Sequence, residues 1–331
     1  MKDFNGRLAV ITGAGSGMGR ELAVQLAAAG CHLGLCDIGV LSLEETRALC
    51  AAAGPAGLKI SIHRCDVADE AQVLAFRDAV KAEHGTECVH LLFNNAGIGG
   101  GGSFIADERS EWERTFGVCW YGVYYCSRAF LPLVLAAPEA HIVNTSSVNG
   151  FWASLGPAVP HTAYSAAKFA VKGFTEALIN DCRLNAPHVK VSLVMPGHIG
   201  TSIALNTGKI LRGRDAMGMT AAEVADARAR MAARGLPVDN LPDDHIRAAM
   251  HQMAVDFREK APLTAAQAAT IILDGVREGR WRILVGEDAK QLDAMVRAEP
   301  ELAYEPDFTE RMRAQGVLAN LAQGSAQSGG G

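Results

Sequence analysis

Short runs of apolar residues, each bounded by glycine or polar turn-forming residues, recur along the chain. A run without polar alternation is typical of a strand that is buried on both faces of a parallel sheet. We therefore predict strands over residues 8–11, 33–36, 60–62, 89–93, 142–143, 189–194 and 283–285.

Stretches rich in Ala, Leu and Glu lie between these runs and favour helices. They predict helices over residues 20–29, 43–53, 70–83, 111–135 and 162–184. Strands that alternate with helices imply right-handed crossovers and a doubly wound parallel sheet, so the predicted class is α/β with a Rossmann fold. Ligands of such sheets bind beyond the carboxyl ends of the strands.

The alternation stops after residue 197, and the next apolar run begins only near residue 282. We expect one domain made of residues 1–201 and 263–300, with residues 202–262 inserted as a helical lid over the substrate. Within the insertion, residues 220–234 and 243–260 have helical character. Its apolar side chains either line a substrate pocket or pack within a helical cap, and both readings stay open: Ile203, Leu205, Ile210, Leu211, Met217 and Met219.

Residues 301–331 form a C-terminal extension, in which the Gly/Ser/Gln-rich residues 323–331 are expected to be a disordered tail. The polar residues 1–6 leave no room for a signal peptide before the first apolar run.

The composition, with 49% hydrophobic and 20% charged residues among 331, is that of a globular protein. A net charge of -5 offers no basic face for nucleic acid, and no apolar stretch is long enough for a membrane helix. The eight cysteines occur singly, without the close pairs of a zinc site, so we expect no metal and reduced thiols in a cytoplasmic protein.

The first predicted strand runs directly into the sequence Thr-Gly-Ala-Gly-Ser-Gly-Met-Gly at residues 12–19. Glycines permit a tight turn and close backbone approach, so the next helix can offer free N–H groups and its positive end to a pyrophosphate. A glycine-rich turn without a ligand is the alternative. The predicted dinucleotide-binding residues here are Gly13, Ser16, Gly17, Met18 and Gly19.

Asp37 ends the second predicted strand. A carboxylate at this place accepts hydrogen bonds from the adenosine ribose and repels a 2′-phosphate, which favours NAD over NADP. Ile38, not a basic residue, follows it, whereas Arg20 in the first helical turn keeps NADP open as the less favoured cofactor. An aspartate that only caps the next loop is the alternative.

Further motifs follow the later strands in a fixed order. With them the chain resembles the short-chain dehydrogenases/reductases that carry a TGxxxGxG loop, over residues 5–205 and 262–300. The motifs are Asp66-Val67, Asn94-Asn95-Ala96-Gly97, Ser147, Tyr164-Ser165-Ala166-Ala167-Lys168, and Pro196-Gly197 with Ile199 and Thr201.

Tyr164 and Lys168 are four residues apart, so on a helix both side chains leave the same face. A phenol with a pKa near 10 is a poor base at neutral pH unless a nearby cation stabilises the phenolate. The resemblance implies that Tyr164 exchanges the substrate proton, that Lys168 lowers its pKa and holds the nicotinamide ribose, and that Ser147 hydrogen-bonds the substrate oxygen. An amphipathic helix with a solvated lysine is the alternative for the pair, and Ser146 is the alternative to Ser147.

The resemblance also implies further cofactor contacts. Asn95, Ala96 and Gly97 would line the adenosine side, Asp66 and Val67 the adenine edge, and Ile199 and Thr201 the nicotinamide carboxamide. Ordinary loop hydrogen bonds are the alternative for these residues.

The sequence departs from the family at two places. Cys119 stands where the family often has an asparagine that holds a relay water, so the proton relay is rerouted or weakened, or Cys119 is only a small buried residue. The loop over residues 151–161 is longer than usual and is expected to border the substrate site with Phe151, Trp152 and Leu155. His161 and His198 fall near the site, where a lone histidine is more often a local hydrogen bonder than a catalyst.

We expect an enzyme, an NAD-dependent oxidoreductase that interconverts a secondary alcohol and a ketone on an apolar substrate of moderate size. The alternatives are an NADP-dependent carbonyl reductase, an epimerase or dehydratase, and a non-catalytic nucleotide-binding protein. The resemblance further implies a homodimer or homotetramer packed through residues 111–135 and 162–184.

Overall fold

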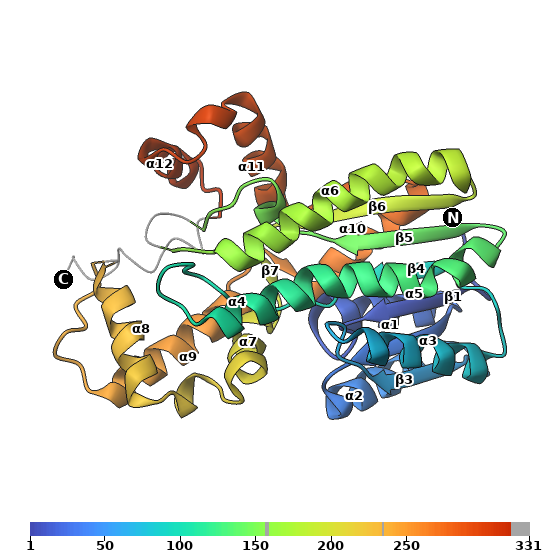
Figure 1. The fold of residues 1–331 in the computed structure, drawn as a ribbon, viewed down its shortest axis with the longest axis horizontal. Helices are drawn as coiled ribbons and strands as arrows, with labels where there is room; N and C mark the ends of the chain where they lie inside the picture. Colours follow the sequence, from blue (N-terminus) through green and yellow to red (C-terminus); the bar gives the residue numbers. More distant parts are fainter. Residues whose placement is uncertain (156–158, 234, 319–331) are drawn as a thin grey trace.

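The computed structural model describes residues 1–155, 159–233 and 235–318. Its centre is a seven-stranded sheet with the order β3-β2-β1-β4-β5-β6-β9, in which every neighbouring pair is parallel (Figure 1). The strands are β1 (Leu8–Thr12), β2 (His32–Asp37), β3 (Ile60–Arg64), β4 (Leu91–Asn94), β5 (Ala140–Thr145), β6 (Val189–Pro196) and β9 (Arg282–Val285). All seven predicted strands and the doubly wound sheet are confirmed.

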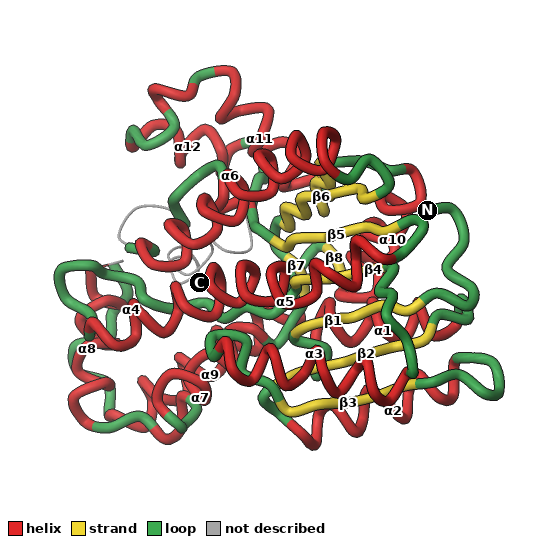
Figure 2. The backbone as a smooth tube through the Cα atoms, turned by 45° about the vertical axis from the view of Figure 1, so that its right-hand side comes forward, coloured by secondary structure: helices red, strands yellow, loops and turns green. Residues whose placement is uncertain are grey.

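Helices cover both faces of the sheet because successive strand residues point in opposite directions. In β1, Leu8 and Val10 enter one apolar core, whereas Ala9 and Ile11 enter the other. Figure 2 shows the helices on the two sides of the strands. The core that contains Ala9 and Ile11 is covered by α1 (Gly17–Ala28), α2 (Val40–Ala53) and α10 (Ala265–Glu278). The core that contains Leu8 and Val10 is covered by α3 (Glu70–His84), α5 (Gly122–Ala136) and α6 (Thr162–Asn185).

The predicted continuous helix over residues 111–135 is divided in the structure. The chain forms α4 (Arg109–Phe116), one π-helical turn (Gly117–Tyr121) and then α5. Hydrophobic periodicity does not reveal this turn, because one inserted residue leaves the apolar character of the stretch unchanged. π-helical turns occur frequently at functional sites, and this one contains Cys119.

The insertion leaves the sheet after β7 (Ile199–Gly200) and returns at β8 (Leu263–Thr264), which pairs with β7. It contains α7 (Ile203–Arg212), the short helix η3 (Ala216–Gly218), α8 (Ala221–Ala233) and α9 (Asp243–Glu259). The two helices expected here are present, although residue 234 lies outside the described residues, whereas α7 was not predicted. Met219 packs in a small core of the insertion, while Met217 is exposed.

The last described helices are α11 (Glu287–Ala298), η4 (Pro300–Leu302) and α12 (Pro306–Ala314), which pack against the 3-10 turn η2 (Val148–Gly150) and the residues after it. The expected disorder of residues 323–331 concerns positions outside the described residues. All eight cysteines lie in the described part of the chain and are free. No helix of the described residues is both long and apolar enough to cross a membrane.

Candidate active site

The glycine loop between β1 and α1 has a conformation that only glycine fits. Gly13 has a φ of 64°, and a Cβ atom there would lie 2.8 Å from the Cα of Ala96. A Cβ atom on Gly19 would collide with the carbonyl oxygen of Gly13. Ser16 precedes α1 without a side-chain cap, so the N–H groups of the first helical turn are open to an acceptor such as a phosphate. The loop therefore fits a dinucleotide.

Asp37 lies beside this loop at the end of β2. Its carboxylate accepts hydrogen bonds from the backbone N–H of Gly15 at 2.9 Å and of Gly39 at 3.0 Å. Arg20 does not pair with Asp37, since its guanidinium donates to the carbonyl oxygen of Gly15 at 2.7 Å and binds Glu45 at 2.8 Å. The loop is thus held to a fixed carboxylate, with one arginine close by.

Asp66 has a partner that the sequence did not indicate. Arg114 of α4 binds both carboxylate oxygens of Asp66, at 3.1 and 2.8 Å, and the backbone N–H of Ala68 donates to the same group. These two residues are 48 positions apart, and no local pattern connects them. The contact fixes the carboxylate at the border of the cofactor pocket.

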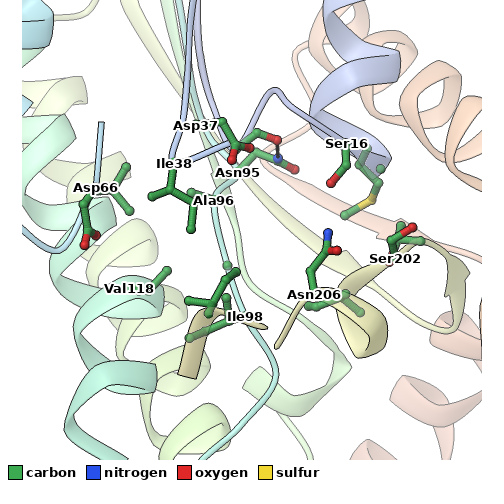
Figure 3. A pocket seen from close by; sticks show the side chains of 18 of the residues that line it. Ser16, Asp37, Ile38, Asp66, Asn95, Ala96, Ile98, Val118, Ser202 and Asn206 are labelled. Atoms are coloured by element: carbon green, nitrogen blue, oxygen red, sulfur yellow. Dashed lines mark hydrogen bonds between the residues drawn. The ribbon is translucent and has the colours of Figure 1, made fainter. Parts of the chain in front are cut away.

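One pocket collects most of the predicted cofactor residues (Figure 3). Asp66 and Val118 lie on one side of it, and Ser16, Ser202 and Asn206 lie on the other. Of the predicted residues, those that line it are Gly13, Ser16, Gly17, Met18, Asp37, Asp66, Val67, Asn95, Ala96, Gly97 and Thr201. Gly19 is not among them, because it supports the turn from behind.

Helix α7 of the insertion closes part of this pocket, which sequence reasoning missed. Ile203, Asn206 and Ile210 contribute to its lining. The hydroxyl of Thr207 accepts a hydrogen bond from the backbone N–H of Gly99 at 3.0 Å. The apolar residues of the insertion therefore divide between pocket lining and packing.

A second cavity of about 430 Å³ adjoins the first. The two share five lining residues, Met18, Asn95, Gly97, Thr201 and Ile203. Ser147, Tyr164 and Lys168 open onto it, as does Ile199. The 151–161 loop, the insertion and the C-terminal segment add further apolar side chains to its lining: Leu155, Val159, Ala204, Phe257 and Leu318.

The three predicted catalytic residues meet at the start of α6. Ser147 follows β5; its hydroxyl accepts a hydrogen bond from the backbone N–H of Asn149 at 3.1 Å and lies close enough to Tyr164 to lower the pKa of the phenol. The ammonium of Lys168 lies 5.4 Å from the centroid of the Tyr164 ring and donates to the carbonyl oxygen of Thr145 at 2.9 Å. Ser146 instead donates to the main-chain oxygen of Lys168 at 2.8 Å, so Ser147 is the serine that contacts the phenol.

Burial dominates the protonation of these groups. It raises the pKa of the Tyr164 phenol, the neighbouring Cys119 raises it further, and the hydrogen bond to Ser147 lowers it. Burial also lowers the pKa of Lys168. The phenol is therefore held as a proton donor, and any cation that enters the site favours the phenolate.

Cys119 lies beside this group and is fully buried. Its thiol donates to the carbonyl oxygen of Ile98 at 3.2 Å. The residue is thus close enough to affect Tyr164, while its own hydrogen is directed to the backbone.

Two histidines also line the second cavity. The ring of His161 lies against that of Tyr164, with centroids 4.7 Å apart and the two planes tilted by 31°, and burial lowers the pKa of His161 to about 4. His198 contacts the insertion, because its ring nitrogen Nε2 lies 2.7 Å from the carbonyl oxygen of Phe257. Both side chains face the site, as their sequence positions suggested.

The parallel sheet carries a glycine turn and a strand-end aspartate, and a Ser-Tyr-Lys group lies beside an apolar cavity. These features are typical of a dinucleotide-dependent oxidoreductase. The sequence model for short chain dehydrogenases matches residues 7–209. The chain is 38% identical over 297 residues to the SadH protein of Mycobacterium tuberculosis, covering 90% of this chain and 92% of SadH. It belongs to the short-chain dehydrogenase/reductase family.

Solved structures agree with this assignment. A short-chain dehydrogenase/reductase from Burkholderia phymatum, in complex with NAD, is 33% identical with a TM-score of 0.72, covering 92% of this chain and 98% of that one. A metagenomic short-chain oxidoreductase in complex with NADP is also 33% identical, with a TM-score of 0.51 over 59% of this chain and 83% of that one. Relatives thus include binders of either nucleotide.

Proposed function

We propose that this protein is an NAD-dependent dehydrogenase that interconverts a secondary alcohol and a ketone of moderate size and low polarity. The observation that carries the proposal is that Ser147, Tyr164 and Lys168 open onto an apolar cavity that shares a border with the dinucleotide pocket. A cavity of about 430 Å³ falls in the range that small ligands occupy.

Each group has a defined task in this reaction. NAD would supply the hydride acceptor when it is bound, held by the glycine turn, Asp37 and the residues that line the first pocket. Tyr164 takes the hydroxyl proton of the alcohol, Ser147 hydrogen-bonds the same oxygen, and Lys168 stabilises the phenolate. His161, neutral at physiological pH, adds no charge to the apolar cavity.

The choice of NAD rests on Asp37, whose carboxylate is fixed by two backbone N–H groups. Arg20 supports the second candidate, an NADP-dependent carbonyl reductase, because its guanidinium contacts the glycine loop at Gly15. In the first candidate, Arg20 remains bound to Glu45 and does not meet the cofactor.

The deciding experiment measures nicotinamide absorbance with aliphatic, alicyclic, aromatic and steroidal secondary alcohols, each with NAD and with NADP. We expect turnover with NAD on at least one apolar alcohol. Turnover with NADP alone would favour the carbonyl reductase. If neither nucleotide gives turnover although fluorescence confirms NADH binding, a non-catalytic nucleotide-binding protein is favoured.

We also propose a homo-oligomer built through α5 and α6, and a cytoplasmic setting in keeping with the free thiols. Tyr124 of α5 and Phe169 of α6 expose large aromatic side chains, as does Tyr121 at the end of the π-helical turn. Light scattering coupled to size exclusion should give the mass of two or four chains, and a monomer would exclude this assembly.

A further inference from the structure

The C-terminal segment of the chain, residues 299–318, is bonded to the loop that follows the catalytic Ser147. The indole N–H of Trp152 donates to the carbonyl oxygen of Ala303 at 2.7 Å, and the indole is almost completely buried. The hydroxyl of Tyr304 accepts a hydrogen bond from the backbone N–H of Ala153 at 2.9 Å. These bonds join two parts of the chain that are 151 positions apart.

Apolar packing reinforces this junction. The rings of Trp152 and Phe308 pack at a tilt with centroids 5.9 Å apart, and Val148 packs in the same cluster. Val148 lines the second cavity. The C-terminal segment therefore packs against a residue of the cavity wall, Val148.

The same segment then enters the cavity directly. After α12 the chain turns at Gly316, which has a φ of 72°, and the N–H of Val317 donates to the carbonyl oxygen of Met312 at 3.0 Å. Leu318, which lines the cavity, has a φ of 52° and is the one non-glycine residue with positive φ among the described residues. A left-handed backbone is strained for a leucine, and such strained residues occur at ligand sites.

Two helical units flank the N-terminal end of α6, where Tyr164 lies. Figures 1 and 2 show α11 and α12 on one side of it and α8 and α9 on the other. Phe257 of α9 lines the cavity from the insertion, and Leu318 lines it from the C-terminal segment. Side chains from the insertion and from the C-terminal segment thus border the cavity, and the described residues of both segments lie outside the central sheet.

We propose that the C-terminal segment is a specificity element, in which Leu318 limits the size of the larger apolar substituent on the substrate carbinol. This inference rests on the proposed function and refines its substrate class to neutral secondary alcohols with one bulky apolar group. Neutral substrates fit because the described lining carries no charged side chain besides the catalytic Lys168.

The test compares Leu318→Trp and Leu318→Ala with the wild type and with Leu302→Ala. Leu302 belongs to the same segment, but its side chain is 45% exposed and does not line the cavity. The measured quantity is the ratio of kcat/KM for 1-cyclohexylethanol to that for 2-butanol. Thermal melting and NADH affinity show whether each variant is folded and binds cofactor.

We expect Leu318→Trp to lower this ratio about tenfold or more and Leu318→Ala to raise it about threefold, with Leu302→Ala unchanged. Equal ratios in all four folded proteins would overturn the inference while leaving the dehydrogenase intact. If the wild type oxidises no alcohol, the proposed function fails instead. The affinity of the NADH complex for the neutral dye Nile red is then measured in place of the kcat/KM ratio. In the dye measurement, Leu318→Trp should bind Nile red about fivefold more weakly than Leu302→Ala does. Equal dye affinities of the two variants would overturn the inference.

Discussion

The two halves of the site are built in different ways. The cofactor pocket is formed mainly by turns at the carboxyl ends of β1, β2, β3 and β4, which the sheet itself brings together. The substrate cavity draws on the 151–161 loop, the insertion and the C-terminal segment, and no described residue of these segments pairs with the central sheet. The geometry of the cofactor pocket thus follows from the central sheet. The shape of the substrate cavity depends on segments added to that sheet.

Tyr164 stands where the two halves meet, and its removal should have the largest effect. We expect Tyr164→Phe to lower kcat for alcohol oxidation by about 10³-fold because the proton acceptor is lost, with the affinity for NADH unchanged. In the wild type, oxidation should also slow as the pH falls, since burial raises the pKa of this phenol and less phenolate is present. Stopped-flow rates and NADH fluorescence titration measure both, and substantial residual turnover in Tyr164→Phe would exclude its role as the base.

This contrast also explains what could be predicted from the sequence. Gly13 and Asp37 were found because a strand, a turn and a helix lie next to each other in the chain, so a short pattern specifies their geometry. Arg114, Phe257 and Leu318 were missed because each reaches the site through tertiary packing. The π-helical turn around Cys119 was missed for a related reason, since it changes the hydrogen bonding of a helix without changing its apolar pattern.

A change confined to the cofactor half sharpens the comparison. Gly13→Ala places a Cβ atom at a φ of 64° against the backbone of Ala96, and strain of about 1–3 kcal/mol should weaken NADH binding about ten- to a hundredfold. Gly173→Ala on α6 is the matched control, because apart from its chain neighbours and the backbone of its own helix no atom lies within 4 Å of the added Cβ. Fluorescence titration compares the two, and equal NADH affinities would show that the turn does not need glycine.

The insertion lines both the cofactor pocket and the substrate cavity, so a change in it can affect both. Arg212 of α7 binds Glu111 of α4 through two hydrogen bonds, at 2.5 and 3.1 Å. Because this pair is partly exposed, we expect Arg212→Ala to raise KM for the alcohol only about two- to fivefold. Arg258→Ala is the control, since Arg258 pairs with Glu259 within its own helix. A loss of kcat at unchanged KM would mean that the insertion acts on the chemical step.

The smallest effect is expected at Cys119, which belongs to neither half and lies behind the catalytic group. Its thiol is fully buried and donates to the carbonyl oxygen of Ile98, so its hydrogen bond is already made within the backbone. Cys119→Asn should therefore change kcat less than about threefold and displace the pH profile of oxidation no more than Cys119→Ser, the conservative control. A proton relay at this position predicts the opposite: a faster reaction in Cys119→Asn, a displaced pH profile and an altered solvent isotope effect. Because Cys119 raises the pKa of Tyr164, a displaced profile in both variants would instead trace to the loss of the sulfur, and only a change specific to asparagine would assign the relay to this site.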